Sequence, residues 1–119
     1  MHAVVPATLA AMLLISGDAS AQINPFGGAQ GVTLSNDDFA AMSRAADKLL
    51  ARPHLVVGSN ESWKNPNTGS TGTISIQSNF VRKALACHTL GYQVAPSGTP
   101  TDGVAVLDWC RTAQGWRIS

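Results

Sequence analysis

The chain has little charge and no concentration of it. Its 8 Lys and Arg and 7 Asp and Glu leave a formal net charge of +1 over 119 residues, without a run of like charges. Nucleic-acid-binding domains normally carry a basic stripe, and membrane-surface patches need clustered charge. The sequence therefore predicts no nucleic-acid partner and no charged membrane-binding face.

The spacings that mark metal and catalytic sites are also missing. Zinc ligands usually come in Cys or His pairs a few residues apart. Cys87, His88, Asp108 and Cys110 include ligand types, but the adjacent Cys87 and His88 point to opposite faces of a strand. The same geometry disfavours a Cys87 nucleophile with His88 as its base. We expect no cofactor, no metal site and no catalytic residue.

One apolar run, residues 4–15, has the length of a signal-peptide core and is too short to cross a bilayer. Ala19-Ser20-Ala21 places small residues before a cleavage site at Gln22, although the preceding region has His2 and no Lys or Arg. A buried helix of the folded domain is the alternative. We predict an exported protein with a signal peptide over residues 1–21 and no transmembrane helix in the mature chain.

In an oxidising compartment, the two cysteines can form a stable disulfide. Cys87 and Cys110 lie on two expected neighbouring strands, and a disulfide persists outside the cytosol. A disulfide is the favoured reading, with a zinc site and two free thiols as the alternatives.

The remaining sequence divides into a leader and one domain. Residues 22–33 contain Pro25, Gly27, Gly28 and Gly31, and we expect this leader to be flexible rather than packed. Residues 34–119 form the domain, which is small enough to have a modest core.

A helix opens the domain. Ser35 is a favourable N-cap, and Asp38 three residues later completes a capping box. Apolar residues then recur at helical spacing: Phe39, Met42, Ala46, Leu49 and Leu50. Pro53 predicts that the helix ends at Ala51 or Arg52.

Beyond residue 53 the apolar period changes to two. A short apolar run lies at 55–57, and residues 62–65 lead into a turn at 66–69. Strands are expected at 71–77, 85–94 and 104–111, with a bulge or bend at Gly91, and a tight turn at Gly115 leads into residues 116–118. The fold class is therefore α+β, with one N-terminal amphipathic helix packed on a small antiparallel sheet of about four or five strands.

Two blocks of this domain carry a resemblance to a known family. They are Ser62-Trp63-x-Asn65-Pro66-x-Thr68-Gly69-x-x-Gly72 and Asp108-Trp109-Cys110-Arg111 followed by Gly115-Trp116-Arg117-Ile118. With Cys87 between them, they resemble the bacterial surface-antigen-like family, which is related to the C-terminal domain of the rickettsial outer-membrane surface antigen. The resemblance covers residues 34–119 and implies an exported protein of the periplasm or outer membrane of a Gram-negative bacterium. Many members are lipoproteins, whereas no cysteine directly follows the apolar run here, and His88 stands where Arg is common.

Three function classes follow. The first is a structural or surface-antigen protein of the cell envelope. The second is an envelope binding module for peptidoglycan, lipid or a partner protein, with Trp63, Trp109 and Trp116 as candidate binding residues. The least favoured is an enzyme. Clustered, exposed tryptophans would favour the binding module over the structural protein.

Overall fold

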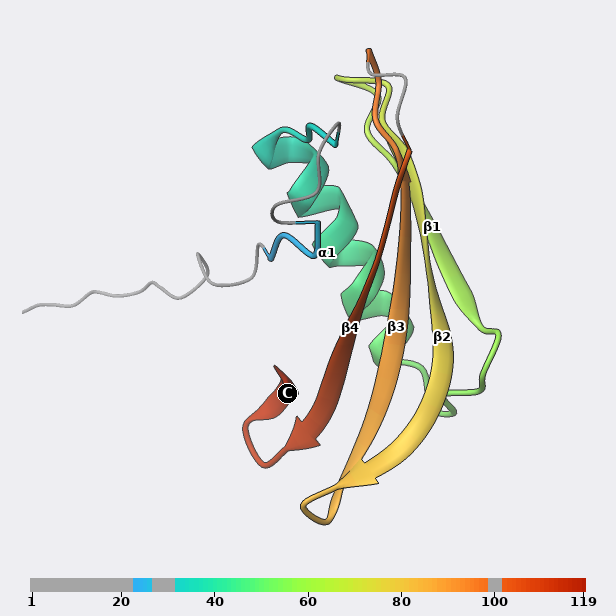
Figure 1. The fold of residues 1–119 in the computed structure, drawn as a ribbon, viewed down its shortest axis with the longest axis vertical. Helices are drawn as coiled ribbons and strands as arrows, with labels where there is room; N and C mark the ends of the chain where they lie inside the picture. The colour runs from blue at the N-terminus through green and yellow to red at the C-terminus, as the bar shows by residue number, and fades with distance from the viewer. Residues whose placement is uncertain (1–22, 27–31, 99–101) are drawn as a thin grey trace, which may run out of the picture.

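The computed structural model describes residues 23–26, 32–98 and 102–119 (Figure 1). The signal segment and residues 27–31 of the leader lie outside the described residues. The helix α1 (Asn36–Leu50) precedes five strands: β1 (Asn60–Lys64), β2 (Thr71–Arg82), β3 (Leu85–Ala95), β4 (Gly103–Thr112) and β5 (Gly115–Ile118). The strands form one antiparallel sheet in sequence order, with α1 against one face. The α+β class with a small antiparallel sheet is confirmed.

The start of α1 follows the predicted capping pattern. The Ser35 hydroxyl accepts a hydrogen bond from the Asp38 backbone N–H at 3.1 Å, and the Asp38 carboxylate accepts one from the Ser35 N–H at 2.9 Å. These reciprocal bonds satisfy two donors that a helix start leaves unpaired. The helix ends at Leu50 with Ala51 as its C-cap, one residue before the earliest predicted end.

The core lies between α1 and one face of the sheet. Met42 and Leu49 of α1 are 2% and 0% exposed. Across the sheet, Ile74 is opposite Tyr92 and Ile76 is opposite Leu90, and all four side chains are buried. We call this side of the sheet the core face. Because side chains alternate along a strand, Thr73 and Ser75 lie on the other side, the outer face.

The irregularity of the sheet lies in β2 rather than in β3. The β2–β3 register shifts between Ile76 and Ser78, whereas Gly91 pairs regularly with Ser75 and Val106. The predicted bulge at Gly91 is therefore wrong. A Cβ atom at Gly91 would collide with the amide end of the Gln77 side chain, so a larger residue there would displace that flexible side chain.

Part of the leader packs into the core, contrary to the expectation that it would not. Phe26 is 4% exposed and belongs to the hydrophobic core, with Val32 packed against it. These two residues pack there because Gly103, distant in the sequence, has no side chain. A Cβ atom at Gly103 would lie 3.1 Å from the Phe26 ring and 2.9 Å from Val32. The glycine at the start of β4 leaves the space that these two side chains occupy.

Candidate functional site

Cys87 and Cys110 form a disulfide between β3 and β4. They are directly opposite each other in the ladder, with an S–S bond and a Cα–Cα distance of 4.0 Å. This distance lies below the usual range of about 4.4–6.8 Å because the two residues form a narrow antiparallel pair. Both thiols are used, so the zinc and free-thiol alternatives do not apply to this structure. Within the described residues, no group of His, Cys, Asp and Glu could hold a metal ion.

The Asn-Pro-x-Thr-Gly block fastens the β1–β2 turn to the start of the helix. Asp38 Oδ1 accepts hydrogen bonds from Asn65 Nδ2 at 2.8 Å and from Thr68 Oγ1 at 2.6 Å. Burial alone would raise the pKa of the Asp38 carboxyl, but the hydrogen bonds from Thr68, Ser35 and Asn65 outweigh it and hold the pKa below its ordinary value. The distinctive block therefore has an observed structural use in joining two elements.

The three candidate tryptophans do not form one exposed surface. Trp63 is 8% exposed and belongs to the core on the β1 side of the sheet. Trp109 and Trp116 are half-buried on β4 and β5, where the Trp109 indole N–H donates to the Tyr92 hydroxyl at 3.0 Å. The clustered, exposed set that would favour binding through tryptophan is therefore not present.

His88 lies beside this second group of aromatic residues. Its Nδ1 is 2.6 Å from Asn79 Oδ1, and its ring meets Trp116 edge-on with centroids 5.4 Å apart. Burial lowers the pKa of His88 below its ordinary value because a buried imidazolium loses its hydration. Within the described chain, the His88 ring contacts the Asn79 amide and Trp116 rather than a carboxylate or a thiolate, as expected of a packed neutral imidazole.

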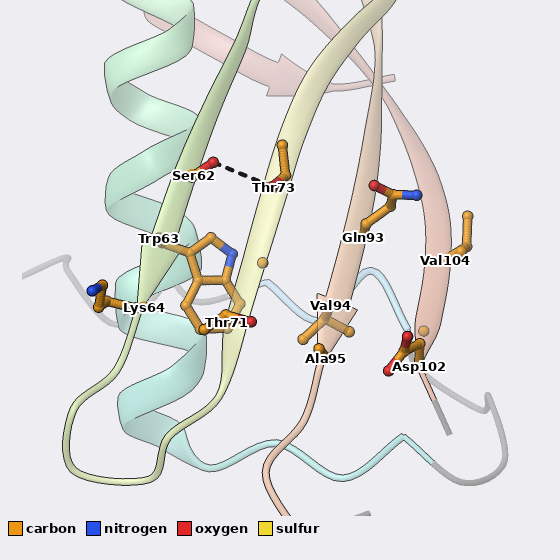
Figure 2. A pocket seen from close by; sticks show the side chains of 12 residues that line it. Ser62, Trp63, Lys64, Thr71, Thr73, Gln93, Val94, Ala95, Asp102 and Val104 are labelled. Atoms are coloured by element: carbon orange, nitrogen blue, oxygen red, sulfur yellow. Dashed lines mark hydrogen bonds between the residues drawn. The ribbon is translucent and has the colours of Figure 1, made fainter. Parts of the chain in front are cut away.

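A groove on the outer face was not predicted from the sequence. It has a volume of about 600 Å³ and lies across β1–β4 near the ends of β3 and β1 (Figure 2). One row of directly opposed residues crosses it: Ser62, Thr73, Gln93 and Val104. The signal that could have found it is the set of small polar residues on the outer-face side of β1 and β2, namely Ser62, Thr71 and Thr73.

The groove offers neutral hydrogen-bonding groups and one charge of each sign. Ser62 Oγ and Thr73 Oγ1 are 3.2 Å apart and share a hydrogen bond, and Gln93 is exposed beside them. Lys64 lies at one side and Asp102 at the other (Figure 2). These hydroxyl, amide and charged groups can form hydrogen bonds with a polar ligand.

Comparisons with protein-family models, with curated proteins and with solved structures found no match to this chain. No helix among the described residues is long and apolar enough to cross a membrane.

Proposed function

We propose that this chain is an exported protein of the bacterial cell envelope that acts as a structural or surface-antigen domain and not through catalysis. The observation that carries the proposal is the Cys87–Cys110 disulfide, which uses every cysteine in the sequence. Such a bond persists in the periplasm and on cell surfaces and is rare in the cytosol. The apolar run at residues 4–15 and the small residues before Gln22 supply the matching export signal.

The proposal is tested by producing the full sequence in a Gram-negative host. N-terminal mass analysis should find an exported chain that begins at Gln22, and thiol titration without reductant should find no free cysteine. Protease treatment of intact cells then separates a surface-exposed protein from a periplasmic one. A full-length, reduced chain retained in the cytoplasm would contradict the proposal.

The groove on the outer face favours a second candidate, an envelope binding module. Its hydroxyl and amide groups suit a neutral polar ligand of the peptidoglycan glycan type better than the acyl chain of a lipid. This version of the binding hypothesis no longer depends on exposed tryptophans.

Calorimetric titration with soluble peptidoglycan fragments tests this second candidate. Gln93→Ala should weaken binding, because Gln93 is an exposed amide in the groove. Ser75→Ala is the matched control, since Ser75 lies on the same face of β2 but does not line the groove. Equal binding by both variants, or none by the unaltered protein, would reject the groove as a glycan site.

A further inference from the structure

The groove on the outer face is formed by three parallel rows of residues. Each row crosses the sheet from β1 to β4 with one residue at each strand, as the ladder registers define. The rows run from Ser62 to Val104, from Trp63 to Gly103, and from Lys64 to Asp102, which directly precedes β4. The groove therefore runs across the strands rather than along them (Figure 2).

The middle row is the floor of the groove, and the two outer rows are its walls. Trp63 and Val94 are buried on the core face, so the middle row presents mainly backbone to the outer face. Residues two apart along a strand are separated by about 6.6 Å, which sets the spacing of the walls. Neighbouring strands lie about 4.8 Å apart, so three intervals make the groove about 14 Å long. Its volume of about 600 Å³ is typical of a site for a small ligand.

The two walls differ in chemistry. One wall is neutral, with the Ser62 and Thr73 hydroxyls hydrogen-bonded to each other and Gln93 exposed beside them. The other wall has Lys64 at its β1 end and Asp102 at its β4 end (Figure 2). Both charged side chains are exposed, and within the described chain neither makes an ion pair or a hydrogen bond. Strands about 14 Å apart hold the two charges beyond the screening length of about 10 Å in 0.1 M salt, so they do not neutralise each other.

We propose that the groove binds a short, extended zwitterionic peptide, with its carboxylate at Lys64 and its ammonium group at Asp102. An extended chain spans about 3.3–3.6 Å per residue, so about four residues cover the length of the groove. The peptide backbone lies over the floor, within reach of the Thr71 and Thr73 hydroxyls and the Gln93 amide. These three groups both donate and accept hydrogen bonds, as an amide backbone requires.

This inference rests on the groove being a ligand site, which is the second candidate function above, and it names the part of peptidoglycan that the groove takes. Peptidoglycan links its glycan chains through short peptides that carry carboxylate and ammonium groups. A neutral glycan segment can bond to the hydroxyl wall but leaves Lys64 and Asp102 unused. The two unpaired charges at opposite ends of the groove therefore favour the peptide portion over the glycan portion.

The test is an NMR titration of the oxidised, ¹⁵N-labelled protein with tetra-alanine, whose two termini are both charged near neutral pH. We expect the amide signals of Gly72 and Gly103 in the floor to shift. N-acetylated and C-amidated tetra-alanine each lack one charge and should each bind about threefold more weakly, the scale of an exposed ion pair. Di-alanine and hexa-alanine should also bind more weakly, because their charges do not match the length of the groove.

Two protein variants assign each end of the peptide. Lys64→Gln should weaken the binding of tetra-alanine about threefold and leave the C-amidated form unaffected, because that form lacks the carboxylate that Lys64 pairs with. Asp102→Asn should likewise weaken tetra-alanine and leave the N-acetylated form unaffected. Lys83→Gln and Asp37→Asn are the matched controls and should change no affinity, since both residues are exposed and lie outside the groove.

Equal affinity for the free, acetylated and amidated peptides would overturn the proposal, and so would amide shifts confined to residues outside the groove. Titration with di-N-acetylchitobiose, a neutral amino-sugar disaccharide, separates this inference from the candidate function on which it rests. Binding of the disaccharide in the groove without binding of tetra-alanine would overturn the peptide assignment and retain the glycan site. Binding of neither compound would reject both.

Discussion

Asp38 combines three tasks in one side chain. Its carboxylate caps the helix through the Ser35 N–H and accepts bonds from Asn65 and Thr68. The residue is 2% exposed, so each of these donors would lose its partner in a dry environment if the charge were removed.

Asp38→Asn should lower the free energy of unfolding by about 2 kcal/mol at neutral pH, the scale for buried hydrogen bonds to a charged group. Because the folded pKa is depressed below the ordinary 3.8, the contribution of Asp38 is fully present above pH 3.8 and is lost as the pH falls through the folded value. Urea titrations of both proteins from pH 7 downwards measure this difference. Asp37→Asn is the control, since the exposed Asp37 carboxylate makes a long contact of 3.5 Å with Asn67 on the surface. Equal losses in the two variants would contradict the role of Asp38.

His88 predicts a second pH dependence. Burial depresses its folded pKa below the ordinary 6.5, so the unfolded chain takes up a proton first as the pH falls. Its contribution to stability should be present above pH 6.5 and decline between that value and the folded pKa. His88→Gln should flatten the stability profile in this window. An NMR titration in which the folded imidazole titrates at or above 6.5 would refute the prediction.

At the scale of elements, the disulfide joins the neighbouring strands β3 and β4. Cys87 and Cys110 are 23 residues apart in sequence and close a loop that contains most of β3, the β3–β4 connection and most of β4. In the chain-entropy description, a loop of this length contributes about 3 kcal/mol. Small domains have only about 5–15 kcal/mol in total.

Reduction should therefore lower the melting temperature markedly and release no metal. Thermal unfolding followed by circular dichroism, with and without a phosphine reductant, measures the shift. The Cys87→Ala/Cys110→Ala double variant should melt near the reduced protein and should not respond to reductant. A reduced protein that melts with the oxidised one would show that the bond is dispensable.

The β2–β3 hairpin is a part of the fold whose boundaries the sequence did not predict. The strand predicted over residues 71–77 continues to Arg82, and the chain reverses at Lys83 and Ala84, which have φ angles of 52° and 65°. Such two-residue turns usually contain Asn or Gly, because positive φ strains other residues. Without that signal the end of β2 was not predictable, whereas the turn after Asn65 carried its own signal in Pro66 and Gly69.

At the scale of the molecule, the helix and the sheet share one core and should unfold together. Met42 is 2% exposed and belongs to the same hydrophobic core as the buried isoleucines and leucine of β2 and β3. Met42→Asp places an unpaired carboxylate in this core and should cost about 4 kcal/mol or more. Arg44→Asp should cost much less, because Arg44 is exposed on the other side of the helix.

The measurement is urea unfolding followed in parallel by circular dichroism and tryptophan fluorescence. In the unaltered protein the two transitions should coincide, as expected for a single cooperative domain. Separate transitions would show that the helix and the sheet unfold independently.

The sequence by itself determined the features that depend on neighbouring residues. Ser35 and Asp38 indicated the helix start, and the period-two patterns placed the middle of each long strand. The meander followed from short connections, and it brought Cys87 opposite Cys110. These features are local or follow from strand order, which is why composition and spacing were sufficient.

Only the tertiary structure decided where side chains from distant segments meet. It placed Phe26 of the leader over Gly103, kept Trp63 apart from Trp109 and Trp116, and moved the bulge to Gln77. It also made the polar groove from four strands and paired the short β5 with the end of β4, from Trp109 to Thr112. These outcomes depend on register and on which strand ends first, and both are fixed by packing across the whole sheet.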